Sequence, residues 1–111
     1  ASGRCRRSGM RRKAKKDLNH NETSDGLRRL GYSVLDLSRL GDGCPDVAVG
    51  WDFGAGDRGA AMIEIKKPGP PSARKLTDDQ EDFKKTWTGP YFVVQSWEEA
   101  AAELLILRRG W

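Results

Sequence analysis

Runs of apolar residues, separated by polar and glycine-rich segments, predict an alternation of short helices and strands. The segment from Leu18 to Leu30 suits a helix, with Asp17 as its N-cap and Gly31 as its stop. Four apolar runs are predicted as strands: Tyr32 to Leu37, Asp46 to Gly50, Ala60 to Lys66 and Tyr91 to Gln95. A proline-rich stretch follows the third run and ends it, because proline cannot continue a hydrogen-bonded ladder.

Two capping patterns predict two more helices. The segment Thr77 to Gln80 fits a capping box, in which the first and last residues each bond the backbone of the other. Ser96 to Glu99 has the same form and would open a helix that runs through Leu107 and ends at Gly110. The predicted order is therefore helix, three strands, helix, strand, helix (αβββαβα). This is an α/β fold in which helices flank a central mixed four-stranded sheet.

Two acids and a lysine are predicted to meet at one end of the second and third strands. A hairpin symmetric about Ala55 places Asp46 opposite Glu64, with Cβ atoms about 5 Å apart. Lys66 follows Glu64 by two residues and so points to the same face. Neighbouring carboxylates repel each other unless a cation lies between them, and Mg²⁺ takes oxygen ligands and activates water. The patch therefore suits phosphodiester hydrolysis, although alternating charges on an ordinary exposed strand also explain it.

Basic residues are concentrated at the N-terminus. The first 16 residues hold eight Lys or Arg and no acid, which leaves 12 basic residues against 16 acidic ones in the rest of the chain. Such an arm suits a polyanion, because each neutralised phosphate releases counterions, although a solvated terminus explains it too. We expect residues 1–16 to form a basic arm and residues 17–111 to form a single domain.

The composition argues against other classes of protein. No apolar run approaches the roughly 18 residues of a membrane span and no signal-peptide pattern is visible, so we expect a soluble, cytoplasmic protein that does not contact a membrane. Cys5 and Cys44 make no disulfide framework and, with only His20 to join them, no zinc site. We interpret His20 as a surface residue of the first helix, and we expect no organic cofactor.

Several motifs, in order along the chain, resemble a known nuclease superfamily. Pro45-Asp46 followed by Glu64-Ile65-Lys66 is similar to the PD-(D/E)XK signature. Over roughly residues 17–102, further segments resemble the stand-alone VRR-NUC proteins of bacteriophages: 17–22, 34–38, 41–46 and 73–77 with Gln80. The resemblance implies a restriction-endonuclease-like core and an Mg²⁺- or Mn²⁺-dependent endonuclease in the bacterial host cell. It implies DNA as the partner, branched DNA such as Holliday junctions in particular, and the symmetry of that substrate suggests a homodimer.

The resemblance also implies roles for individual residues. The metal ligands would be Glu22, Asp46, Glu64 and the backbone carbonyl of Ile65. The catalytic residues would be Asp46, Glu64, Lys66 and Gln80. Contacts with DNA phosphates would come from Ser38, Arg74, Lys75 and, in the arm, Arg11, Arg12, Lys13, Lys15 and Lys16.

Some of these roles have ordinary structural alternatives. Gln80 could simply cap its helix, and Glu22 could lie on a solvated helix face. Ser38 could be a turn residue, and Arg74 with Lys75 could be an ordinary exposed basic pair. At the level of function, the alternatives are a non-catalytic DNA-binding module that keeps the nuclease fold, and a nuclease of linear or flap DNA. The intact set of two acids and a lysine argues against the non-catalytic module.

Overall fold

The computed structural model describes residues 18–110 of the chain. A first helix spans residues 18–29. The elements that follow are β1 (Ser33–Asp36), β2 (Val47–Asp52), β3 (Arg58–Ile65), the short 3-10 helix η1 (Pro71–Arg74), α2 (Asp78–Thr86), β4 (Tyr91–Val94) and α3 (Trp97–Arg109). Apart from η1, this is the predicted order αβββαβα. Asp17, the predicted N-cap, and the basic arm lie outside the described residues.

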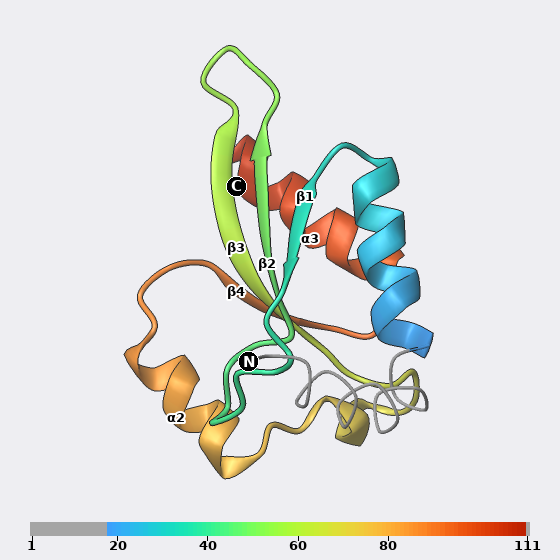
Figure 1. The fold of residues 1–111 in the computed structure, drawn as a ribbon, viewed down its shortest axis with the longest axis vertical. Helices are drawn as coiled ribbons and strands as arrows, with labels where there is room; N and C mark the ends of the chain where they lie inside the picture. Colours follow the sequence, from blue (N-terminus) through green and yellow to red (C-terminus); the bar gives the residue numbers. More distant parts are fainter. Residues whose placement is uncertain (1–17, 111) are drawn as a thin grey trace, which may run out of the picture.

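The four strands form one mixed sheet, as predicted. Their order is β1-β2-β3-β4, and all neighbours are antiparallel except the parallel pair β3 and β4. The first helix and α3 lie on one side of the sheet, whereas α2 lies at the end where β2 begins and β3 ends (Figure 1). A side chain carried by α2 can therefore reach the ends of these two strands.

The hairpin of β2 and β3 has the register that the sequence predicts. Val47 pairs with Ile63, and the pairing continues in step to the turn, so that the hairpin is centred on Ala55. Asp46 and Glu64 come one residue beyond the pair Val47–Ile63 and stand opposite each other at the open end of the hairpin. The two acids thus come together through the strand register alone.

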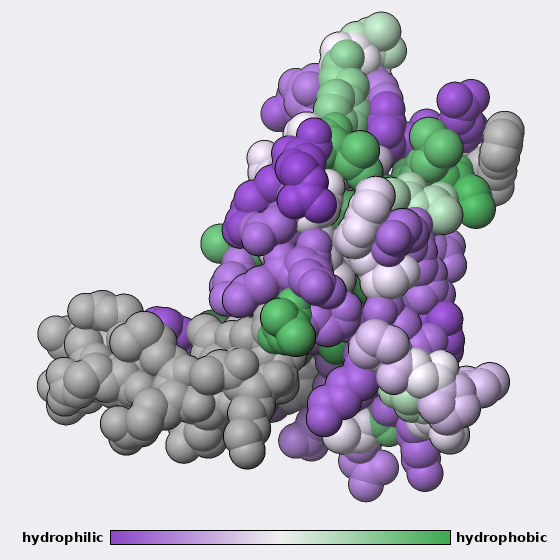
Figure 2. Space-filling view, turned by 90° about the vertical axis from the view of Figure 1, so that its right-hand side faces the viewer, coloured by the Kyte–Doolittle hydropathy of each residue, from purple (hydrophilic) through white to green (hydrophobic). Residues whose placement is uncertain are grey.

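Alternate residues of the central strands fill the core. Val47 and Ile63 are fully buried, and Leu27 of the first helix and Leu104 of α3 cover them. Burial of each such side chain stabilises the fold by about 1.5–3 kcal/mol. The outer side of the helices is mostly hydrophilic, with apolar residues in separate small patches (Figure 2). The intervening strand residues face away from this core, and the two acids are among them.

One arginine ties the tip of the hairpin to the end of α3. Arg108 donates to both carboxylate oxygens of Asp57, at 2.6 and 3.2 Å, and to the hydroxyl of Tyr32 at 3.0 Å. Its guanidinium also lies 4.3 Å from the ring centre of Phe53. Trp51 is buried beneath this group and donates its indole N–H to Asp57. These contacts explain why β2 and β3 extend further toward the turn than the sequence predicts.

The cap of α3 differs from the predicted capping box. The hydroxyl of Ser96 accepts from the N–H of Glu99 at 3.1 Å, as expected. The carboxylate of Glu99, however, accepts from the N–H of Gln95 at 2.8 Å, and its other oxygen lies 2.6 Å from Arg74. The prediction of a complete box at α3 was therefore wrong in its second half, because a long-range ion pair draws the carboxylate away from the cap.

We expect Asp57→Asn to weaken the dependence of stability on acidic pH. Hydrogen bonds from Arg108 hold the pKa of Asp57 below its ordinary value. The ion pair therefore stabilises the fold above the ordinary pKa of an aspartate, and this contribution is lost as the pH falls through the lowered pKa. Melting temperatures measured from about pH 7 to about pH 2 should fall less steeply in the variant. Asp52→Asn removes an exposed carboxylate from the same hairpin as a control, and an equal response of both variants to acid would contradict the prediction.

Candidate active site

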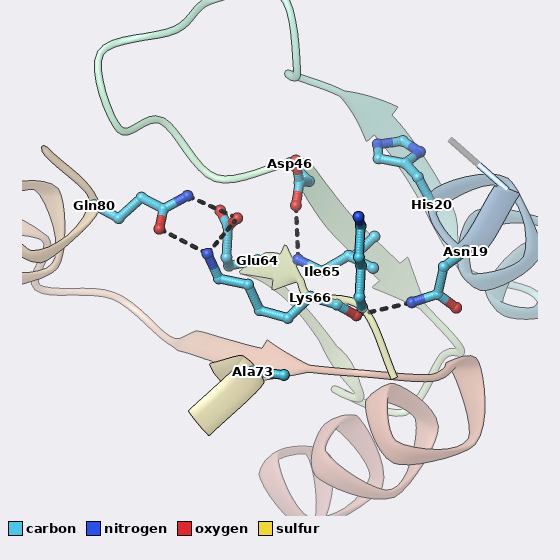
Figure 3. Close-up of a pocket in the computed structure, with 9 residues that line it drawn as sticks. Asn19, His20, Asp46, Glu64, Ile65, Lys66, Ala73 and Gln80 are labelled. Carbon is cyan, nitrogen blue, oxygen red and sulfur yellow. Dashed lines mark hydrogen bonds and ion pairs between the residues drawn. The ribbon is translucent and has the colours of Figure 1, made fainter. Parts of the chain in front are cut away.

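A pocket of about 410 Å³ lies where β2 begins and β3 ends. It combines acidic, basic and amide side chains that come from the first helix, from the hairpin and from α2 (Figure 3). The lining residues are Asn19, His20, Asp46, Glu64, Ile65, Lys66, Lys67, Ala73 and Gln80. Five of the sequence-predicted site residues therefore meet here: Asp46, Glu64, Ile65, Lys66 and Gln80.

The carboxylate of Asp46 is fixed by the neighbouring strand. One oxygen, Oδ2, accepts a hydrogen bond of 2.7 Å from the backbone N–H of Ile65. This bond joins the residue before β2 to the last residue of β3, so it also closes the open end of the hairpin. The half-buried side chain of Asp46 is thereby oriented next to the end of the strand that carries Glu64.

Glu64 is buried together with its counter-ion. Only 4 % of the residue is exposed, and its Oε2 lies 3.8 Å from the ammonium nitrogen of Lys66. The same oxygen accepts 2.9 Å from the side-chain amide of Gln80. A buried carboxylate is costly unless it is paired and hydrogen-bonded, and Lys66 and Gln80 supply these two kinds of contact.

Gln80 holds the acid and the lysine together and caps its own helix. Its Oε1 accepts from Lys66 Nζ at 2.9 Å and from the N–H of Thr77 at 2.8 Å. Its Nε2 donates to Glu64, and its backbone N–H donates to the hydroxyl of Thr77 at 3.2 Å. The sequence left open whether Gln80 is a cap or a site residue. The structure shows that the same side chain makes both sets of contacts.

The two carboxylates create a negative electrostatic potential around them. Burial first, and then the charges of Glu64 and Asp46, raise the pKa of the Tyr91 hydroxyl to about 12. The same causes, in the same order, raise the pKa of the Cys44 thiol. Both groups therefore stay protonated near neutral pH, and a cation in the pocket would relieve the field that they sense.

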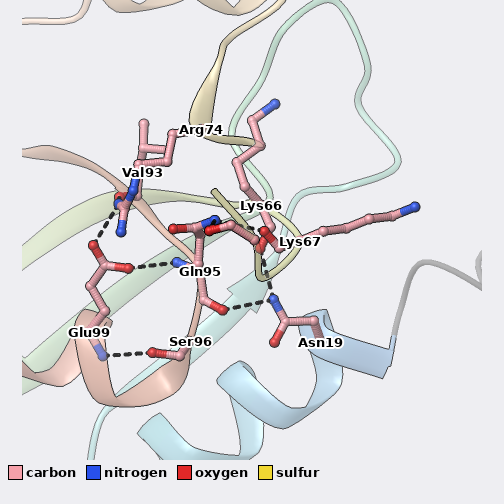
Figure 4. A network of polar contacts seen from close by, with 9 residues as sticks. Asn19, Lys66, Lys67, Arg74, Val93, Gln95, Ser96 and Glu99 are labelled. Carbon is pink, nitrogen blue, oxygen red and sulfur yellow. Dashed lines mark hydrogen bonds and ion pairs between the residues drawn. The ribbon is translucent and has the colours of Figure 1, made fainter. Parts of the chain in front are cut away.

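A polar clamp holds the chain where it leaves β3 (Figure 4). Asn19 donates its amide to the backbone carbonyls of Lys66, at 2.9 Å, and Gln95, at 3.2 Å. Gln95 in turn donates to the carbonyls of Lys67 and Gly69. The clamp fixes the backbone of Lys66 from the first helix. Sequence reasoning missed it, since Asn19 and Gln95 are 76 positions apart.

The surface position predicted for His20 was wrong. His20 is only 7 % exposed and lines the pocket. Thr23, Ser24 and Leu27 are buried as well, so positions 20, 23, 24 and 27 form the inward face of the first helix. That spacing was visible in the sequence, but three of the four residues are polar and concealed the pattern.

The structure does not bring Glu22 to the two acids. Glu22 is exposed and lines a separate pocket that opens toward the start of α3 and includes Trp97. Successive residues are about 100° apart around a helix, so Glu22 points about 200° away from His20. The first helix therefore brings His20, and not Glu22, into the pocket of the two acids. The expectation that Glu22 joins Asp46 there was wrong.

The candidate DNA contacts are spread over several environments. The hydroxyl and N–H of Ser38 both bond the carboxylate of Asp36, as in a turn. Arg74 forms an ion pair with Glu99 and donates to the carbonyl of Val93, and 40 % of its side chain is exposed. Lys75 is exposed. The remaining candidates lie outside the described residues: Arg11, Arg12, Lys13, Lys15 and Lys16.

The donors in the pocket suit a hard divalent cation. The carboxylates of Asp46 and Glu64 and the backbone of Ile65 offer oxygen ligands. Among residues 18–110, no three His, Cys, Asp or Glu side chains are grouped so that they alone could hold a metal. Mg²⁺ needs only one or two carboxylates, because water and substrate phosphates complete its shell. The site therefore fits Mg²⁺ or Mn²⁺, and it does not resemble a closed structural zinc site.

Comparisons with known proteins identify no relative of this chain. No protein-family model, no curated protein and no solved structure matches the chain. Within residues 18–110, no helix is both long and apolar enough to cross a membrane.

Proposed function

We propose that this protein is a metal-dependent endonuclease that hydrolyses phosphodiester bonds in DNA. The observation that carries the proposal is the meeting of Asp46 and Glu64 at the open end of one hairpin, beside the ammonium group of Lys66. Two acids and a lysine in one open pocket supply both a place for a divalent cation and a positive group for a phosphate.

Lys66 would be the catalytic lysine, a positive group that the protein supplies in addition to the metal ion. Its ammonium is held by Gln80 and Glu64, so it occupies a defined position before any substrate arrives. A preorganised ammonium can stabilise the charge that develops on a phosphate, or orient the attacking water, without further rearrangement. Bound Mg²⁺ or Mn²⁺ would polarise a phosphoryl oxygen and lower the pKa of a water molecule. Asp46 and Glu64 would hold the ion, with the carbonyl of Ile65 as a further oxygen.

The proposed substrate is DNA, preferably branched. The concentration of eight basic residues in the first 16 supports a polyanionic partner, since the rest of the chain carries more acid than base. The preference for branched DNA is supported by the motif resemblance to VRR-NUC nucleases. A four-way junction is two-fold symmetric, so we further propose that a homodimer places one site on each of two strands.

A cleavage assay tests the proposal. The full chain is incubated with labelled four-way junction, flap and linear duplex DNA, in Mg²⁺, Mn²⁺ or EDTA. We expect cutting that needs the metal, is fastest on the junction and yields paired symmetric incisions. Equal cutting of linear or flap DNA would remove the junction preference and keep the hydrolase. DNA binding without cutting in any metal would overturn the hydrolase in favour of a non-catalytic binding module.

We expect Gln80→Ala to lower the cleavage rate by at least about 10-fold and the free energy of unfolding by about 1–2 kcal/mol. The variant loses the bridge between Glu64 and Lys66 as well as part of the helix cap. Thr77→Ala is the matched control, because it removes only the capping hydroxyl. Single-turnover rates and melting temperatures should show similar losses of stability in both variants and a much larger loss of rate in Gln80→Ala. Equal rates in the two variants would assign Gln80 to the cap alone.

A further inference from the structure

A buried histidine, His20, lines the pocket together with the two acids. Neither ring nitrogen of His20 has a hydrogen-bond partner among the described residues, although the residue is 7 % exposed. A buried polar atom left without a hydrogen bond destabilises the fold. Since His20 lines the same pocket as Asp46 and Glu64, the contents of that pocket are the natural partner of its ring.

A carboxylate stands behind the imidazole. Nε2 of His20 lies 3.7 Å from Oδ1 of Asp36. That oxygen also accepts from the N–H of Ser38 at 2.8 Å and from its hydroxyl at 2.6 Å. Histidines that bind metals usually direct one ring nitrogen to a carboxylate or carbonyl and the other to the ion. Asp36 lies near Nε2 in a comparable position, beyond hydrogen-bond distance, and Nδ1 is the ring nitrogen that has no charged neighbour.

We propose that His20, in place of Glu22, is the ligand that the first helix contributes to a divalent cation in this pocket. The inference rests on the proposed function, since it concerns the same ion. No group of three acidic, cysteine or histidine side chains in residues 18–110 could hold a metal unaided. His20 would therefore act beside the carboxylates proposed above, and water and phosphate oxygens would complete the shell of the ion. An imidazole nitrogen favours first-row transition ions such as Mn²⁺ or Co²⁺ over Mg²⁺.

Because the chain contains a single histidine, the ligand can be identified without any substitution. The full protein is prepared with natural or ¹⁵N-labelled histidine, loaded with Mn²⁺ and studied by pulsed electron paramagnetic resonance. We expect electron spin echo modulation from a directly bound nitrogen, with frequencies that change on labelling. Bound Mn²⁺ that shows no histidine nitrogen would overturn the role of His20 and leave the nuclease proposal standing. A protein that binds no Mn²⁺ and cuts no DNA would overturn both.

Two matched variants on the first helix give a second readout. His20→Gln should weaken Mn²⁺ binding by at least about 10-fold, and should weaken Mg²⁺ binding less. Glu22→Gln, two residues away on the exposed face, should leave the affinity for Mn²⁺ unchanged. Titration calorimetry measures the affinities, and circular dichroism verifies that both variants are folded. Loss of affinity in Glu22→Gln with none in His20→Gln would reverse the assignment.

Discussion

Replacement of Asp46 by asparagine is expected to lower the rate of DNA cleavage by at least about 10³-fold, which corresponds to about 4 kcal/mol of transition-state stabilisation. Asparagine has the same shape, and its amide oxygen can still accept the hydrogen bond from Ile65 N–H that closes the hairpin. The fold should therefore survive. What is lost is the negative charge that attracts a divalent cation to the pocket. Single-turnover cleavage at saturating Mg²⁺ measures the effect.

The specificity of this loss can be tested with a nearby acid. Asp42→Asn is the matched control, because Asp42 is exposed in the loop before β2 and has a positive φ of 55°, which asparagine tolerates well. It should cleave at the wild-type rate. DNA binding, measured in Ca²⁺, should be the same in both variants. Cleavage by Asp46→Asn within about 10-fold of the wild type would show that Asp46 is not a metal ligand.

Gly43→Ala should lower the free energy of unfolding by about 2–4 kcal/mol and slow cleavage at the same time. Gly43 has a φ of +78°, and a Cβ atom there would lie 2.2 Å from the backbone carbonyl oxygen of Asp79 and 2.9 Å from the nitrogen of Gln80. The first turn of α2 would have to move away from the loop. Because that turn carries Gln80, the contacts with Glu64 and Lys66 would move with it.

A substitution at a second glycine of the same loop distinguishes the cost of backbone strain from the effect of moving α2. Gly41 has a similar φ of +68°, but a Cβ atom there would meet nothing within 4 Å. Gly41→Ala should therefore lose only the about 1–2 kcal/mol of the left-handed conformation and keep its cleavage rate. Chemical denaturation and single-turnover assays on both variants measure the difference. If the two variants lose equal stability and equal activity, the loop does not position α2.

The parts of the site that depend on local sequence relations were predictable. The facing positions of Asp46 and Glu64 follow from the symmetry of one hairpin, and Lys66 follows from the two-residue period of a strand. The cap at Gln80 is a pattern of four consecutive residues. In each case the interacting groups are joined by a short connection with few possible geometries.

The parts that the sequence did not reveal depend on contacts between distant segments. The ion pair of Arg74 with Glu99, for example, joins residues that are 25 positions apart in the sequence. The burial of His20 depends on how the first helix rotates against the sheet, and that rotation is set by Leu27 in the core. Residue type alone could not distinguish the exposed Glu22 from the buried His20, since both are polar and common on helix surfaces.

The sharing of Gln80 between the cap of α2 and the site has a dynamic consequence. Fraying of the first turn of α2 would also remove the bridge between Glu64 and Lys66, because the same amide contacts the cap and both residues. Hydrogen exchange at the backbone N–H of Gln80, which is bonded to Thr77, would report how often this turn and the contacts of Gln80 in the pocket open, without substrate or metal.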